Sequence, residues 1–267
     1  RRQRQMCIRD RLHYSHNEVD ARLAPTNVGS PTLFNVDNPY LTPALQEVFR
    51  QLDLAETGPT TVTSGTATRI NNPGDGLALV TAGRRYVEVG ARAATERRNV
   101  YRGAWGLRGD LGDASENFLT DLKWDAYYTY SRSENTLQLR NALSRSRLQE
   151  SLLSEGGAAP LCNIFGANVS AECASAIRIN ATNTTVATQQ VAQASLTGNL
   201  VNLPAGGAGF SGGFEWRKVS ATFSPDSFLA SGDVAGFNPG LPTQGSVSVK
   251  EACLLYTSDA ADDLLCV

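Results

Sequence analysis

The residues best suited to catalysis or metal binding do not form a complete site in this sequence. Gly209–Gly213 (GFSGG) matches the G-x-S-x-G pattern of serine hydrolases, which needs a strand–turn–helix setting and a histidine after the serine. The two histidines, His13 and His16, lie near the N-terminus, far before Ser211. Their spacing could supply two zinc ligands, but no third ligand follows in step. We therefore expect no catalytic residues, no metal site and no cofactor, and hence no enzyme.

Charged side chains recur instead at every second position of two segments. Asp121, Lys123 and Asp125 do so in Leu119–Ser131, and the pair Glu215 and Arg217 does so in Gly206–Ser220. This period is typical of β-strands, whose successive side chains point to opposite faces. The other face of each segment is apolar and aromatic: Leu122, Trp124, Ala126, Tyr128 and Tyr130 in the first, and Phe210, Phe214 and Trp216 in the second.

Three further segments alternate in the same way. They are Arg98–Arg108, Val191–Leu200 and, more weakly, Gly245–Glu251. Ten residues at about 3.3 Å each, tilted by about 45°, cover roughly 23 Å, which matches the apolar band of an outer-membrane β-barrel. We therefore expect membrane-spanning strands whose charged positions, Asp121, Lys123, Asp125, Glu215 and Arg217, face the lumen of a barrel.

The connections between these segments alternate in length. Gly109–Phe118 and Val201–Ala205 are short, whereas Arg132–Ala187 and Ala221–Gln244 are long. Short turns at one end and long loops at the other are typical of bacterial outer-membrane barrels.

Two more elements are expected upstream of the strands. Pro43–Leu54 has apolar residues at helical spacing, with Thr42 placed to cap it, and we assign it to a short helix within a long loop. Arg84–Ala91 is a candidate strand that could pair with Glu96–Arg102 above the membrane.

A soluble β-sandwich that acts as a binding or adhesion module is the alternative architecture. The long polar rows, the aromatic residues near the ends of the apolar faces and the length of the loops favour the barrel. The net charge of −2 over 267 residues argues against a nucleic-acid partner.

The two ends of the chain match each other at the level of DNA. The reverse complement of one possible coding of Arg1–Asp10, preceded by one T, encodes CLLYTSDAAD, which is the sequence of Cys253–Asp262. We interpret residues 1–11 and 253–267 as translated sequencing-adapter sequence and residues 12–252 as an internal fragment of the natural protein. Neither tail is expected to have packed structure, although the second could briefly extend the last strand.

An ordered series of motifs resembles a known family. The series is NPYLTPALQEVF, ERRNVYRGAWGLRGDLGD, WDAYYTYSRSENT, NIFGANVS, QQVAQASLTGNLVNLPAGGAGFSGGFEWRK and ASGDVAGFN. Together these motifs cover most of Asp37–Ala252 and resemble TonB-dependent outer-membrane receptors. In that family a 22-strand barrel surrounds an N-terminal plug that carries the TonB box. Neither the plug nor the box is seen here, so the resemblance implies roughly a quarter of the barrel.

The resemblance implies transport in the cell outer membrane of a Gram-negative bacterium. An iron chelate, cobalamin or a carbohydrate would bind the external loops, and the TonB–Exb complex would supply energy through the missing plug. The partners are thus outer-membrane lipid, that energy-transducing complex and an external small molecule. No ligand-binding residue can be transferred from the family.

Cys162 and Cys173 are the cysteines that remain between the two adapter-like tails. Two cysteines in one loop outside the cytoplasm predict a disulfide, with Cα atoms roughly 4.4–6.8 Å apart. Two free thiols are the alternative. The bond would stiffen an extracellular loop that we expect to have no core of its own.

The expected fold is therefore all-β. It is a partial antiparallel transmembrane β-barrel, appearing as a curved open sheet with long extracellular loops and a short loop helix.

Overall fold

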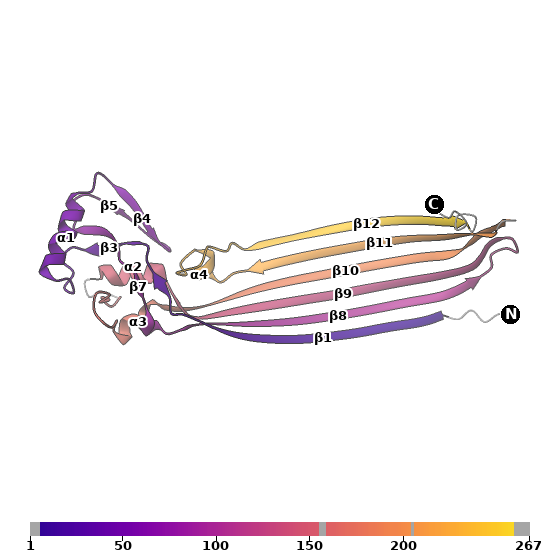
Figure 1. The fold of residues 1–267 in the computed structure, drawn as a ribbon, viewed down its shortest axis with the longest axis horizontal. Coiled ribbons are helices and arrows are strands. Elements are labelled where there is room, and N and C mark those ends of the chain that lie inside the picture. The colour runs from indigo at the N-terminus through magenta and orange to yellow at the C-terminus, as the bar shows by residue number, and fades with distance from the viewer. Residues whose placement is uncertain (1–5, 155–158, 204–205, 259–267) are drawn as a thin grey trace, which may run out of the picture.

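Six long strands form one antiparallel sheet in the computed structural model, which describes residues 6–154, 159–203 and 206–258. Figure 1 shows them side by side, in the order β1 (Met6–Leu23), β8 (Arg92–Gly112), β9 (Phe118–Leu143), β10 (Arg178–Leu203), β11 (Gly206–Ser224) and β12 (Thr243–Ser258). The fold is therefore all-β and antiparallel, as predicted. All five alternating segments lie within β8 to β12, which confirms them as strands.

The strands are longer than the sequence pattern indicated. β9 and β10 have 26 residues each, so the long connection between them is residues 144–177 and not Arg132–Ala187. The second long connection likewise shortens to residues 225–242. The period-two signal was lost in these extensions because both faces become polar there, as in the SRSENT run of β9.

The first strand was missed by the sequence analysis. β1 pairs with β8 from Met6↔Gly109 to Leu23↔Arg92. The expectation was that Arg1–Asp10 lacks packed structure. Met6–Asp10 nevertheless pairs with β8 as part of a strand, although every side chain of β1 is exposed. At the other end Cys253–Ser258 extends β12, as expected. Residues 1–5 and 259–267 lie outside the described residues.

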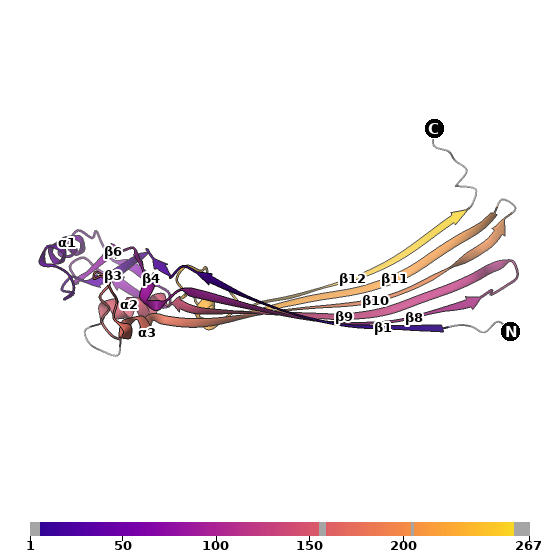
Figure 2. The same cartoon turned by 60° about the horizontal axis from the view of Figure 1, so that its bottom comes forward.

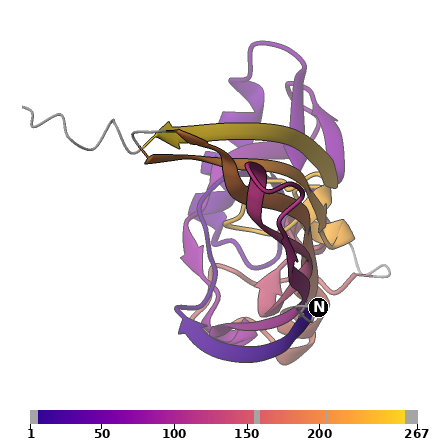
Figure 3. The same cartoon turned by 90° about the vertical axis from the view of Figure 1, so that its right-hand side faces the viewer.

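The sheet is a single open layer. Its strand order begins at β1 and ends at β12, and these two strands are its edges. Figures 2 and 3 show that the sheet twists and bends along its length, with the short β8–β9 turn at the end opposite the lobe. A curved open sheet matches the expectation for this number of strands.

The long connections gather into a folded lobe at the other end of the sheet (Figure 1). It contains three two-stranded sheets, β2 (Asn27–Val28) with β7 (Arg84–Arg85), β3 (Pro31–Asn35) with β6 (Leu77–Thr81), and β4 (Thr60–Ser64) with β5 (Ala67–Asn71). Its helices are α1 (Pro43–Leu54), η1 (Val87–Val89), α2 (Arg145–Leu153), α3 (Ala171–Ile177) and α4 (Ser227–Ala230).

Two expectations about this region have different outcomes. The helix over Pro43–Leu54 is confirmed, with the Thr42 side chain accepting a hydrogen bond from the Leu45 amide. The strand over Arg84–Ala91 is wrong, because only Arg84 and Arg85 are extended and they pair with β2. Glu96–Arg102 lies instead in β8, where β1 and β9 occupy both sides.

The lobe has a hydrophobic core of its own. Phe34, Phe49, Tyr86, Leu148 and Ile177 are buried together with both cysteines of the disulfide. The expectation that the disulfide loop has no core is therefore wrong. The apolar residues that form this core are distributed over three connections, and they follow no periodic pattern that would have predicted it.

Candidate functional site

The long sheet has one apolar and one polar face along the half that ends in the short turns. Register places Trp105 beside Tyr128, Tyr128 beside Ala192 and Ala192 beside Trp216. The next row toward the turns joins Leu107, Ala126, Ala194, Phe214 and Ala252. Residues paired in this way point to the same side of a sheet, so the apolar faces predicted for the separate strands merge into one surface.

The apolar face is open in the described part of the chain. Trp105 is 47% exposed, Phe214 49% and Leu107 40%, and both buried clusters lie at the lobe end instead. A contiguous apolar surface of this kind marks a contact with a membrane or another protein.

Aromatic rings mark the edge of the apolar face that lies toward the lobe. Tyr14 and Tyr101 have ring centroids 5.1 Å apart, and the rings of Trp105 and Tyr128 stack at 6.1 Å. On this face of β11 the aromatic residue nearest the lobe is Trp216, whose indole N–H donates a hydrogen bond of 3.1 Å to Ser248 Oγ. Tyrosine and tryptophan with apolar bodies and polar tips are typical of a membrane–water interface.

This edge runs obliquely across the sheet. The uninterrupted series of apolar residues on this face ends at Tyr101 on β8, Tyr130 on β9, Ala192 on β10 and Trp216 on β11, where the next residue of the face is polar or charged. In the register Tyr130 lies one row closer to the turns than Tyr101, and Ala192 and Trp216 lie one row closer again. A boundary that slants against the rows is what strands tilted in a flat apolar layer require.

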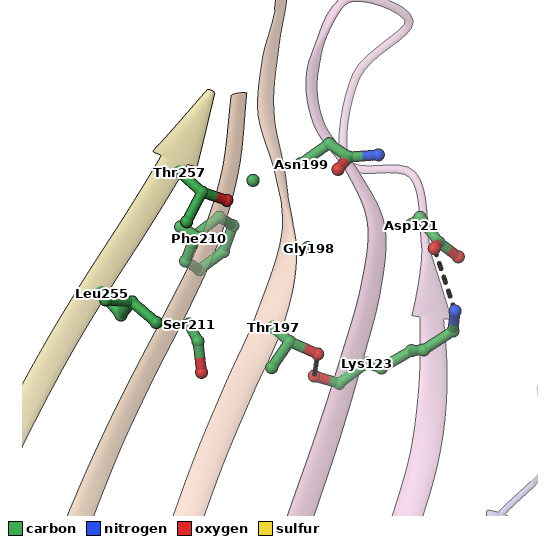
Figure 4. Close-up of a pocket in the computed structure, with 10 residues that line it drawn as sticks. Asp121, Lys123, Thr197, Gly198, Asn199, Phe210, Ser211, Leu255 and Thr257 are labelled. Atoms are coloured by element: carbon green, nitrogen blue, oxygen red, sulfur yellow. Dashed lines mark hydrogen bonds and ion pairs between the residues drawn. The ribbon is translucent and has the colours of Figure 1, made fainter. Parts of the chain in front are cut away.

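The first predicted charged group lies on the polar face of β9 near the short turn. Lys123 Nζ is 2.9 Å from Asp121 Oδ2, and Figure 4 shows Thr197 on the neighbouring strand β10 and Ser211 one strand further, on β11. Asp121 has a φ of 50°, and its amide donates a hydrogen bond of 2.9 Å to Asp113 Oδ1 in the turn. The pair is therefore anchored at the point where the ladder becomes irregular.

The second predicted group lies on the same face two strands away. Arg217 Nη2 is 2.7 Å from Glu215 Oε1 and 3.8 Å from Glu251 Oε2 on β12. Since β10 runs between β9 and β11, the two predicted groups share a face but remain separate ion pairs. A row of mixed charges on one side of a sheet suits contact with water or with a polar protein surface.

Arg108 and Asp110 are among the charged residues of this face that the sequence pattern left unassigned. Arg108 lies directly opposite Asp125, and Asp110 lies directly opposite Lys123. They alternate with Leu107 and Gly109, so extending the period-two reading of β8 to its second face would have found them.

Shallow hollows lie on the polar face of the described strands. The largest, about 980 Å³, is lined by Arg102, Arg108, Asp125 and Tyr127, with Arg9 and His13 from β1. A second, about 390 Å³, lies beside it around Lys123 and Ser195, and a third, about 300 Å³, includes Asp121 and Ser211 (Figure 4). The polar face is thus the side on which a small molecule or an inserted segment could be received.

The predicted disulfide is present and lies inside the lobe. Cys162 and Cys173 are bonded with Cα atoms 5.5 Å apart, within the expected range, and both are fully buried. The bond joins the start of the 162–169 segment to α3, where Ser170 caps the helix by accepting from the Cys173 amide.

A partly buried ion pair connects this segment to the rest of the lobe. Arg84 Nη2 is 2.6 Å from Glu88 Oε1, and Arg84 Nη1 donates to the carbonyls of Ile164 and Gly166. Burial raises the pKa of Glu88, but hydrogen bonds from the Val169 amide and Arg84 outweigh it, so that the pKa is lowered from its ordinary value. Burial also raises the pKa of the neighbouring Tyr86 hydroxyl, so that it stays protonated at neutral pH.

The two motifs suggestive of catalysis or metal binding do not assemble. Ser211 lies inside β11 with strand on both sides, not at a strand–turn–helix junction. His13 and His16 lie in β1, and their odd and even positions place them on opposite faces of the sheet. In the described residues no cluster of three metal-ligating side chains occurs, and no helix there is long and apolar enough to cross a membrane.

Comparison with known proteins gave no match: no protein family, no curated protein and no solved structure resembles the chain significantly.

Proposed function

We propose that the chain is part of an outer-membrane receptor that transports an external ligand. The observation that carries the proposal is the open apolar face with an oblique aromatic edge, opposite a face of paired charges. An aqueous protein would not leave this face bare, whereas a strand wall between lipid and a wet lumen requires this division.

The lengths of the connections support the proposal and give the sheet an orientation in the membrane. The short β8–β9 connection, residues 113–117, is at one end of the sheet, and the lobe is at the other. In bacterial barrels the short turns face the periplasm and the long connections face outward. The lobe would therefore lie outside the cell, where an external ligand first meets the protein.

The polar face would line the lumen. Asp121, Lys123, Asp125, Glu215 and Arg217 would contact the plug of a TonB-dependent receptor or border the path that opens when TonB pulls on it. The ligand class, whether iron chelate, cobalamin or carbohydrate, is set by loops and plug together.

Detergent dependence tests the membrane assignment. Expressed and refolded alone, the chain should aggregate in buffer, because the apolar face and two strand edges are exposed, and should become monodisperse in detergent micelles. Size-exclusion chromatography with light scattering measures this. A monodisperse monomer in plain buffer would refute the proposal.

Recovering the contiguous gene tests the receptor assignment. The proposal expects a plug domain upstream, further barrel strands on both sides and a terminal barrel strand downstream. A continuous reading frame that encodes a soluble enzyme or a β-sandwich would exclude a receptor.

A further inference from the structure

Basic side chains follow the oblique aromatic edge on the same face of the sheet. Going toward the lobe, the next residue on that face is Arg132 after Tyr130 on β9, and Lys218 after Trp216 on β11. On β12 it is Lys250, which lies directly opposite Trp216. We name Arg132, Lys218 and Lys250 the basic belt.

The belt runs parallel to the edge of the apolar face. Arg132 lies in the row of Tyr101, Lys218 one row closer to the turns, and Lys250 in the next row. From β9 to β12 the basic belt therefore shifts toward the short turns, parallel to the aromatic edge. A set of surface charges unrelated to a membrane would have no reason to follow that slant.

Two of the three charges have no anionic partner in the described part of the chain. Arg132 is 3.0 Å from Glu134, but neither Lys218 nor Lys250 forms an ion pair there. The nearest carboxylates along their strands, Glu215 and Glu251, point to the other face, where both lie near Arg217.

The two lysines are placed to share one anion. Lys218 lies opposite Ser248 and Lys250 opposite Trp216, so the lysines are diagonal neighbours, about 7–8 Å apart at the backbone. Both are exposed, and the Trp216 indole lies between them at the edge of the apolar face. Two like charges this close repel each other unless an anion sits between them.

We infer that the basic belt binds the phosphate of an anionic lipid headgroup, with Trp216 at the level where the acyl chains begin. The inference rests on the proposed function, because only a membrane that covers the apolar face brings headgroups to this height. At a membrane surface, lysine and arginine beside the apolar layer attract anionic lipid, and the attraction is screened by salt.

Lipid selectivity in micelles tests the inference. The full chain is titrated, in dodecyl maltoside micelles, with dansyl-labelled phosphatidic acid or with dansyl-labelled phosphatidylcholine, and energy transfer from tryptophan reports binding. We expect a clear preference for phosphatidic acid. The Lys218→Gln/Lys250→Gln double variant should weaken that binding roughly thirty-fold.

Two matched variants isolate the belt. Lys218→Arg/Lys250→Arg keeps both charges and should restore the preference, which also shows that the strands still form. Arg69→Gln/Arg102→Gln removes the same charge from the lobe hairpin and from the polar face, both exposed, and should leave lipid binding unchanged.

The outcomes separate the inference from the proposed function. A chain that enters micelles but binds both lipids equally, or loses binding equally in the control variant, overturns the belt and leaves the membrane assignment standing. Competition by inorganic phosphate as effective as that by phosphatidic acid would show a free-anion site and would also overturn it. A chain that is monomeric in plain buffer refutes the proposed function itself.

Discussion

Glu88 is a carboxylate that holds separate segments of the lobe together. Its side chain is 13% exposed, and it joins η1 to both Arg84 and the Val169 amide. The folded pKa is lowered from the ordinary value of 4.5, so Glu88 stabilises the lobe above that pH. The stabilisation should disappear as the pH falls through the lower, folded-state pKa, and hydrogen exchange at the Val169 amide measures it.

The Glu88→Gln variant should lose this acid sensitivity. It leaves Arg84 charged and without its carboxylate, which costs about 3 kcal/mol in the lobe's free energy of opening. Glu47→Gln is the control, because Glu47 forms an exposed ion pair with Arg50 and should leave exchange in the lobe unchanged. Equal effects of the two substitutions would contradict the role given to Glu88.

The disulfide predicts which cysteines can be alkylated, and the two exposed thiols serve as the control. Alkylation of the native chain without reductant should label Cys7 and Cys253, which are exposed thiols, and should not label Cys162 or Cys173. Because the bond is buried, reductant should release it only after the lobe opens in denaturant. The Cys162→Ser/Cys173→Ser variant should lose about 2–3 kcal/mol of lobe stability. Mass spectrometry identifies which cysteines are labelled before and after the lobe opens in denaturant. Labelling of Cys162 in the native chain would argue against a buried bond.

At the scale of elements, one side chain of α2 supplies hydrogen-bond partners to the backbone of β3. Gln149 Oε1 accepts from the Leu33 amide at 3.0 Å, and Gln149 Nε2 donates to the Leu33 carbonyl at 2.9 Å. Gln149→Leu should leave both buried backbone groups unpaired and cost about 1–3 kcal/mol. Faster hydrogen exchange at the Leu33 amide would measure the loss. Gln51→Leu on α1, where the side chain bonds only to the exposed Glu47, should have little effect.

Adjacent residues of β10 test the assignment of the two faces. Leu196 lies opposite Trp124 and Gly212 on the apolar face, whereas Ser195 lies opposite Asp125 and Gly213 on the polar face. Leu196→Arg should weaken insertion into a bilayer or micelle by about 2–4 kcal/mol, because the charge enters hydrocarbon. Ser195→Arg should be tolerated beside Asp125. Detergent-dependent folding measured by circular dichroism compares them, and equal tolerance would argue against a lipid-facing side.

At the scale of the whole molecule, the two ends contribute length to the sheet and nothing to the lobe core. Met6–Arg11 and Cys253–Thr257 extend the edge strands β1 and β12, and all their side chains are exposed. Asp10 lies in the row of Trp105, between Ile8 and Leu12, which lie opposite Leu107 and Gly103 on the same face. Removing residues 1–11 and 253–267 should leave hydrogen exchange at Val169 and Leu33 unchanged. Faster exchange at these amides would show that the tails support the lobe, and sequencing reads that span both ends would test the adapter interpretation directly.

The sequence alone determined the features that depend on local period and capping. Alternation placed five strands and assigned Asp121, Lys123, Asp125, Glu215 and Arg217 to polar faces, and Thr42 with Pro43 marked the start of α1. These signals are local because a strand's face and a helix's first turn are set within a few residues. The same period failed where both faces are polar, so the true lengths of β9 and β10 and the existence of β1 were not visible.

The tertiary structure decided everything that depends on which segments meet. It aligned the separate polar faces into one, kept the two charged groups apart by placing β10 between β9 and β11, and put Arg108 opposite Asp125. It also built a core from residues far apart in sequence, such as Phe34, Leu148 and Ile177, around a disulfide expected to stand alone. Burial and strand register are long-range properties, since they are fixed by the pairing of distant segments and not by any one segment's pattern.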